Sequence, residues 1–290
     1  MFSQLLINGL AIGSLYALMA LAMVMIYKAS EMPNFAQGEM GMITTYIAYM
    51  MLATYEMPVA LSLVLALVFA VALGAGVEFL FLRRAKDPSV LDFIIITLGL
   101  QLMLHGLAGW KWGAEQKDFP FPISDSEIIE IGPVVMSVLN LTTMLIALVL
   151  MLMLYLFFRY TKAGVAMKAT QQNTMAARIN GVRTKRIMSL TWAISSFIGA
   201  VAAILFAPIA TLDPNLMWDP LIKGFAAAVL GGMTTLVGAV LGGYLLGIVE
   251  NLFGAYVSLE FKSVVAFLVI VIVLWFRPSG LFSKHYERKV

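Results

Sequence analysis

The sequence predicts an all-α fold, a polytopic transmembrane helical bundle with interrupted or re-entrant segments. Of the 290 residues, 61% are hydrophobic and only 12% are charged, with a mean hydropathy of +0.93, whereas soluble domains contain roughly 25% charged residues. Because lipid offers the backbone no hydrogen-bond partners, long apolar runs must cross it as helices. We expect a single transmembrane domain over residues 1–290 with about seven to nine membrane segments.

Charge-free runs follow one another along the chain, and most match the roughly 17 to 25 residues that a helix needs to cross the hydrocarbon layer. They occupy residues 1–27, 40–55, 57–77, 93–110, 131–158, 187–212 and 224–249, with a shorter run at 263–276. No Lys or Arg precedes the first run, unlike the basic start of a cleaved signal peptide. We therefore expect this run to be retained as the first helix.

Basic residues gather in one long loop. Residues 159–186 hold seven Lys and Arg residues and no acid, whereas residues 111–132, which include Asp125, hold five acids and two lysines. The other basic segments are the turn with Arg83, Arg84 and Lys86 and the tail with Arg277, Lys284, Arg288 and Lys289. Because positive loops stay in the cytoplasm, we expect the N-terminus outside and the C-terminus inside, so residues 213–277 cross once or three times.

Two stretches interrupt the apolar pattern. The first, MPNFAQGE at residues 32–39, carries Asn34, Gln37 and Glu39 between two apolar runs. The second, within residues 224–256, is rich in glycine and carries Gly231 and Gly232 before two threonines. Interruptions in corresponding positions of two halves indicate a transport path.

The glycine-rich stretch has two interpretations. Paired glycines and threonines are poor helix formers, which predicts two half-helices joined at residues 231–235. Glycines four residues apart, such as Gly238 and Gly242, also allow close packing of unbroken helices. Both interpretations remain open at this point.

The sequence offers no catalytic, metal or cofactor site. It contains no GxxxxGK[ST] phosphate loop, no HExxH motif and no cysteine, so we expect no ATP hydrolysis by that route, no metal centre and no thiolate chemistry. His105 shares a helix face with Gln101 and is interpreted as a packing residue. The acids Glu78, Asp92 and Glu250 lie at or near the ends of runs and are interpreted as interfacial.

The basic loop has an apolar pattern of its own. Met167, Met175, Ile179 and Val182 recur at approximately helical spacing, which predicts a short amphipathic cytoplasmic helix with one apolar face. Such a helix lies on a membrane or docks into the groove of a partner.

Taken together, these segments resemble the membrane subunits of branched-chain amino acid ABC importers, the LivH family. The resemblance rests on GLAIGSLYALMALAMVMIYKAS followed by PNFAQGEM, on residues 163–208, and on AAAVLGGMTTLVGAVLGGYLLG. Family members carry an NFA(H/Q)GE element after the first helix, which residues 34–39 match with glutamine. The late segment departs from the family pattern, because Val237-Gly238-Ala239 lacks the family's proline before Gly-Ala.

The basic loop also resembles the coupling motif of ABC import permeases, an EAA followed after three further residues by glycine. Here the motif reads MAARING, and Met175 replaces the acid. The resemblance implies that this loop docks on an ATPase subunit. The residues concerned are Met175, Ala176, Ala177, Arg178 and Gly181.

By resemblance, the chain is a multi-pass permease subunit of the bacterial inner membrane and not an enzyme. It would translocate branched-chain amino acids or related small polar solutes by alternating access. The implied partners are a second homologous permease, two cytoplasmic ATPase subunits that use ATP, and a periplasmic substrate-binding protein. The alternative is a secondary transporter or channel for solutes such as urea or amides, which would be expected to hold buried ionisable residues.

The resemblance also bears on the interruptions. Asn34, Gln37 and Glu39 are predicted to line the translocation path, where their amide and carboxylate groups would meet a zwitterionic solute or water. The alternative is a structural turn that ends one helix and starts the next. Gly231 and Gly232 are predicted to belong to the same path.

Overall fold

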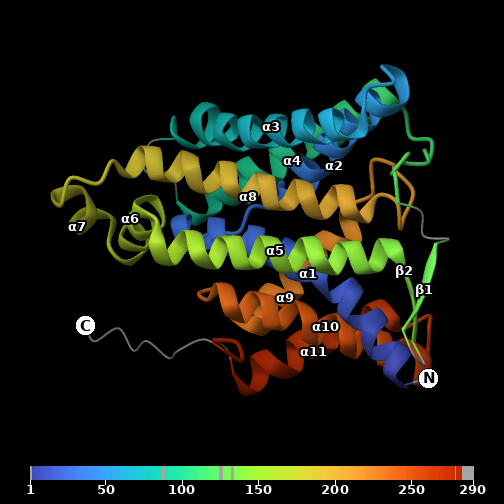
Figure 1. The fold of residues 1–290 in the computed structure, drawn as a ribbon. Helices are drawn as coiled ribbons and strands as arrows, with labels where there is room; N and C mark the ends of the chain where they lie inside the picture. Colours follow the sequence, from blue (N-terminus) through green and yellow to red (C-terminus); the bar gives the residue numbers. More distant parts are fainter. Residues whose placement is uncertain (1, 86–88, 124–126, 132–133, 278, 283–290) are drawn as a thin grey trace.

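The computed structural model describes residues 2–85, 89–123, 127–131, 134–277 and 279–282 and shows a bundle of α-helices (Figure 1). Within this part, six helices are long and apolar enough to cross a membrane: α1 (Phe2–Ser30), α3 continued by the π-helical turn η2 (Val59–Leu82), α4 (Val90–Trp112), α5 (Val138–Tyr160), α8 (Thr184–Phe206) and α10 (Leu236–Tyr256). Shorter helices are α2 (Gln37–Tyr49), continued by η1 (Met50–Thr54), α6 (Lys162–Gln172), α7 (Thr174–Ile179), α9 (Trp218–Gly231) and α11 (Lys262–Phe276). The predicted helical bundle is confirmed. Of the charged residues used above, Lys86, Asp125, Lys284, Arg288 and Lys289 lie outside the described residues.

The loops and helix termini lie at two opposite ends of the bundle. Val135 donates its backbone N–H to Gln4 Oε1 at 2.8 Å, Asn251 donates to the Leu5 carbonyl at 2.6 Å, and Lys117 donates to the Leu212 carbonyl at 3.0 Å. The start of α1, the acidic loop and the end of α10 therefore share one end, which we call the hairpin end. Helices α6 and α7 lie at the other, the basic end (Figure 1). The charge separation predicted from the sequence is thus present, and which end faces the cytoplasm stays a prediction.

Residues 213–277 form three helices, α9, α10 and α11. Helix α9 has 14 residues, about 21 Å of helix, and a turn at residues 232–235 joins it to α10. Beyond α11, Leu281 and Phe282 donate backbone hydrogen bonds to the carbonyls of Leu230 and Gly231 at 2.9 and 3.3 Å. The chain therefore runs between the two ends three times here, but of these three helices only α10 is long and apolar enough by itself to cross a membrane, so the number of crossings stays a prediction.

The apolar run at residues 131–158 is not one helix. Strand β1 (Ile128–Ile131) pairs antiparallel with β2 (Val134–Ser137), with Ile129 opposite Met136. Branched Val and Ile side chains favour extended backbone, and Ser137 then caps α5 by accepting from the Asn140 N–H at 3.2 Å. The expectation of one helix through this run is therefore wrong for Ile131 and for Val134–Ser137.

Helix α1 forms the centre of the bundle. It packs against α5, α8, α9 and α10, and every residue from Ser14 to Ile26 is buried. In contrast, α3, α4 and α5 expose many leucines and valines, as expected for faces turned toward lipid. The first helix of the chain is thus enclosed by later ones.

Glycines bring the backbones of α1 and α10 into contact. A Cβ atom added to Gly9 would lie 2.8 Å from Ile248 Cα, and one added to Gly13 would lie 3.0 Å from Tyr244 Cα. From the other side, a Cβ on Gly247 would lie 2.5 Å from Gly13 Cα. The spacing of these glycines follows the small-xxx-small pattern of membrane helix pairs, so the packing function of the late glycines is confirmed.

A leucine at Gly247 should destabilise the protein, because overpacking of this kind costs about 1–3 kcal/mol or more. The matched control is Gly99→Leu on α4, where an added Cβ meets no atom within 4 Å. Both changes replace glycine by a better helix former, so only the contact differs. Thermal unfolding of the purified protein in detergent should show a lowered midpoint for Gly247→Leu alone. Equal midpoints for the two variants would contradict the close contact.

Candidate functional site

The MPNFAQGE stretch forms the turn between α1 and α2. Asn34 Oδ1 accepts the Ala36 N–H at 3.1 Å, and Asn34 Nδ2 donates to Gln37 Oε1 at 3.1 Å. Glu31, just before the turn, has a φ of 59°, which is uncommon for a residue other than glycine. The first polar interruption is therefore a hydrogen-bonded turn from which α2 starts at Gln37.

Gln37 ties this turn to α8. Its Nε2 donates to the Ser195 carbonyl at 3.1 Å, while Ser195 Oγ lies 3.1 Å from Gln37 Oε1 and 2.7 Å from the Ala22 carbonyl. Gly199 leaves room for the amide, since a Cβ there would overlap Gln37 Nε2. The side chains of Asn34 and Gln37 are fully buried. These contacts fit the structural-turn alternative, and contact of the two amides with a path stays a prediction.

Glu39 faces a histidine on α4. Its Oε1 lies 3.7 Å from His105 Nδ1, and the His105 side chain is 36% exposed while that of Glu39 is 2% exposed. Among the described residues, Glu39 Oε2 and His105 Nδ1 have no hydrogen-bond partner. An unpaired buried polar atom is costly, so packing alone, the role interpreted from the sequence for His105, does not account for this pair.

The join predicted in the glycine-rich stretch is present. Helix α9 ends at Gly231, Gly232 has a φ of 98°, and α10 starts at Leu236 with Thr235 Oγ1 accepting the Gly238 N–H at 3.2 Å. A side chain at Gly231 would collide with the backbone of Gly238. Only α9 is short, however, because α10 is long enough to span a membrane.

The basic loop holds two helices, α6 and α7, where one was expected. Asn173 ends α6 and caps α7, its Oδ1 accepting the Ala176 N–H at 2.9 Å. Met167 on α6 is completely buried, so it does not share an apolar face with Met175 and Ile179 of α7, which are 67% and 79% exposed. The break occurs because the Asn173 side chain forms a hydrogen bond with a backbone N–H that a continuous helix would pair with a backbone carbonyl.

The predicted coupling residues therefore differ in accessibility. Met175, Ala176, Arg178 and Gly181 are exposed, whereas Ala177 is buried in the chain's own fold. Arg178 Nε donates to Thr184 Oγ1 at 3.0 Å, which holds α7 against the start of α8. The apolar surface that α7 presents consists of Met175 and Ile179, one helical turn apart.

A buried ion pair anchors the start of α8 to the end of α3. Arg83 Nη2 lies 2.9 Å from Glu78 Oε2, and it also donates to Ser189 Oγ at 2.6 Å and to the Lys185 carbonyl at 3.0 Å. Ser189 in turn donates to Glu78. Glu78 is only 3% exposed, so the interfacial interpretation of this acid is wrong.

A second buried ion pair, between α9 and α10, was missed by the sequence reasoning. Lys223 Nζ lies 2.6 Å from Glu250 Oε1 and 2.7 Å from Asp219 Oδ2, and it stands 5.5 Å from the centre of the Tyr16 ring. Lys223 and Glu250 are 6% and 1% exposed. Asp219 and Lys223 are four residues apart in an apolar segment, and this spacing could have indicated an ion pair on one helix face. The interfacial interpretation of Glu250 is therefore wrong.

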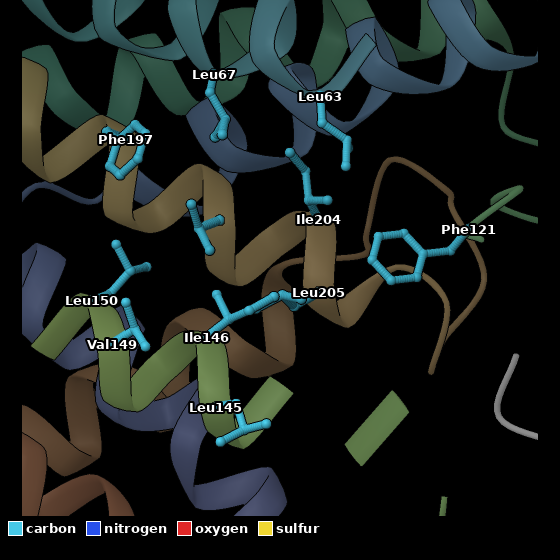
Figure 2. A pocket seen from close by; sticks show the side chains of 11 residues that line it. Leu63, Leu67, Phe121, Leu145, Ile146, Val149, Leu150, Phe197, Ile204 and Leu205 are labelled. Atoms are coloured by element: carbon cyan, nitrogen blue, oxygen red, sulfur yellow. The ribbon is translucent and has the colours of Figure 1, made fainter. Parts of the chain in front are cut away.

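A cavity of about 390 Å³ between α3, α5 and α8 is lined entirely by apolar side chains, among them Leu67, Ile146 and Phe197 (Figure 2). A zwitterionic solute would lose its hydration there without gaining a polar partner. We therefore do not assign this cavity to a transport path.

The chain is similar to proteins of one transport family. The family described as "Branched-chain amino acid transport system / permease component" matches residues 5–274. The high-affinity branched-chain amino acid transport system permease protein LivH of Escherichia coli K12 is 32% identical, covering 100% of this chain and 98% of the relative. BraD, a permease protein of the same description from Pseudomonas aeruginosa, is 31% identical with the same coverage.

The chain also shares its fold with a solved structure. PsaBC from Streptococcus pneumoniae, determined in complex with Fab, superposes with a TM-score of 0.52 over 94% of this chain and 91% of the matched chain. The sequences are 11% identical, so this likeness concerns the fold alone.

Replacement of Lys223 should destabilise the protein more than replacement of its partner. Lys223→Met leaves Glu250 buried without a cation, which typically costs about 3–5 kcal/mol, whereas Glu250→Gln leaves Lys223 paired with Asp219. Thermal unfolding in detergent should rank the variants in this order. The double variant Lys223→Met/Glu250→Gln should recover much of the loss. Equal midpoints for the single variants, without recovery in the double variant, would show that the pair contributes no coupling.

Proposed function

The chain belongs to the family of branched-chain amino acid transport permeases, and on this premise we propose that it is the membrane-spanning subunit of an ATP-driven importer. Its solute would be a branched-chain amino acid or a related small polar compound. The observation that carries the proposal is the family match across residues 5–274. The chain is a multi-pass membrane protein and not an enzyme.

Importers of this class need other subunits. We assign this chain a second homologous permease, two cytoplasmic ATPase subunits and a periplasmic substrate-binding protein. ATP hydrolysis belongs to the ATPase subunits, and the chain itself binds no cofactor in this proposal. The basic end would face the cytoplasm of the bacterial inner membrane, in agreement with the distribution of Lys and Arg, with the N-terminus outside.

Helix α7 is the proposed contact with the ATPase. Met175 and Ile179 present an exposed apolar face one turn apart, the pattern of a helix that docks into a groove. Exposed Arg178 flanks this face and keeps α7 attached to Thr184. The proposed docking face thus omits Ala177 of the predicted coupling residues and keeps Met175 and Ile179 of the predicted apolar face.

Helix α8 connects this contact to the MPNFAQGE turn. It begins at Thr184 beside α7 and carries Ser195, which is hydrogen-bonded to Gln37 of α2. The Glu78–Arg83 pair attaches the start of α8 to the end of α3. A displacement of α7 by the ATPase would move these elements together, which provides a physical route for alternating access.

The polar part of the path is proposed to lie beside Glu39 and His105. This pair brings a buried carboxylate next to a partly exposed imidazole on α4. Asn34 and Gln37 would then support the wall that carries Glu39. Gly231 and Gly232 would form part of the inner mouth at the basic end.

The double variant Met175→Glu/Ile179→Glu should lose ATPase association, because two carboxylates cannot enter an apolar groove without losing hydration. The matched control is Val165→Glu on α6, an exposed apolar position in the same loop. Gel filtration of the detergent-purified complex and ATP turnover stimulated by the loaded binding protein are the measurements. A complex of the double variant with normal stimulated turnover would refute docking through α7. Solute uptake that needs neither ATP nor the ATPase would instead support the secondary-transporter alternative.

Thiol labelling can test the path in this naturally cysteine-free chain. We expect hydrophilic thiol reagents to label His105→Cys in at least one nucleotide state of the complex. Leu102→Cys, on the same helix and 73% exposed, is the control and should remain unlabelled, because we expect this position to face lipid. Gln37→Cys should stay protected if Gln37 only supports the wall, whereas its labelling would place it on the path. Protection of His105→Cys in every nucleotide state would overturn the assignment.

A further inference from the structure

A groove of about 940 Å³ opens on the side of the bundle between α5 and the start of α10. Its walls are apolar and exposed: Leu148 and Leu152 of α5 are 59% and 54% exposed, and Val237 and Leu241 of α10 are 62% and 41% exposed. Leu21 of α1 forms part of the lining. These wall residues belong to none of the coupling or path contacts described above.

The basic end of this groove carries three cations. They are Lys28 of α1, Arg159 of α5 and Lys168 of α6, and no acidic side chain is among the described lining residues. None of the three forms an ion pair with a described acid. Three like charges gathered without a counter-charge indicate an anionic partner.

Arg159 is held in the arrangement of a membrane-interface anchor. Its Nη1 donates to Tyr155 OH at 2.6 Å, and its guanidinium lies 5.4 Å from the centre of the Tyr160 ring. Tyrosine and arginine are typical of the level at which lipid headgroups meet the hydrocarbon. A guanidinium has five N–H donors, so Arg159 retains donors for a further acceptor.

The length of the groove matches one leaflet. From Leu148 to Arg159 the helix rises about 16 Å at 1.5 Å per residue, and half of a ~30 Å hydrocarbon layer is about 15 Å. An occupant that fits has an apolar chain of this length and a negative group at one end. Basic pockets between membrane helices bind anionic headgroups in this manner.

We propose that the groove between α5 and α10 is a binding site for an anionic glycerophospholipid, with its phosphate beside Lys28, Arg159 and Lys168 and an acyl chain along Leu148, Leu152, Val237 and Leu241. Lys168 lies on α6, the helix that precedes α7, and the α9–α10 turn borders the same groove through Thr235. The bound lipid therefore contacts both the coupling loop and the glycine turn. This site is independent of the solute that the importer carries.

The test is native mass spectrometry of the chain purified in detergent with added phosphatidylglycerol or phosphatidylcholine. We expect phosphatidylglycerol to be retained about tenfold or more over phosphatidylcholine, and the variant Lys28→Gln/Arg159→Gln/Lys168→Gln to lose this preference. The matched control Arg84→Gln/Lys162→Gln/Arg186→Gln removes the same charge from residues outside the groove and should keep the preference. Equal retention of the two lipids by the parent, or the same loss in the control, would overturn the proposal.

A second variant tests the apolar wall without changing any charge. Val237→Trp places a large ring at an exposed position, so folding should be preserved while the groove is filled. Retention of phosphatidylglycerol should fall to the level of the triple variant. Undiminished retention would overturn the site, as would displacement of the lipid by millimolar inorganic phosphate, which would indicate an ion site only. A dimer that dissociates in Val237→Trp with lipid retention unchanged would assign the groove to contact between copies of the chain.

Discussion

The bundle depends on the close contact between the backbones of α1 and α10. In a membrane the apolar side chains of a helix are as well accommodated by lipid as by another helix, so association rests on close packing and hydrogen bonds. Gly9 and Gly13 of α1 meet Tyr244, Gly247 and Ile248 of α10 at backbone distance. Because α1 also contacts α5, α8 and α9, its position fixes the helices on every side of it. The glycine-rich late segment is therefore required by the first helix as much as by its own turn.

Buried polar contacts then divide the helices into groups. Gln37 and Ser195 join α2 to α8, and Arg83 with Glu78 joins α3 to the start of α8. A separate pair, Lys223 with Glu250, joins α9 to α10. Each contact satisfies groups that would be costly to leave unpaired in an apolar surrounding. The helices joined to α8 thus form one unit attached to α7, and the α9–α10 hairpin forms another, with α1 between them.

Much of the fold follows from the sequence because apolar run length and charge are local properties. The long helices and the separation of charge between the ends were predictable, and the break after Gly231 was one of the two interpretations that the sequence allowed. The hairpin before Val138 was not, because an apolar run of branched residues is compatible with strand or helix. The split at Asn173 was also missed, since the approximate helical spacing continued across it.

The candidate site was predictable only in part. Asn34, Gln37 and Glu39 stood out as polar residues in an apolar context, but their partners Ser195 and His105 lie far away in the sequence. Lys223 and Glu250 are separated by 27 positions, and nothing local identifies one as the partner of the other. A charged residue near the end of an apolar run has the same position in the sequence whether its side chain reaches water or points into the bundle. Only the tertiary arrangement distinguishes these cases.

The enclosure of α1 has a consequence for biogenesis. Chains are synthesised from the N-terminus, so α1 enters the membrane before α5, α8, α9 and α10 exist to cover it. It must first be apolar enough to reside alone among acyl chains, and later present surfaces small enough for four other helices to approach. Its mean hydropathy of 2.1 in the most apolar window serves the first stage, and Gly9 and Gly13 serve the second. The sequence of α1 thus meets two requirements in turn. During insertion it must be stable among acyl chains, and during assembly it must pack closely against the later helices.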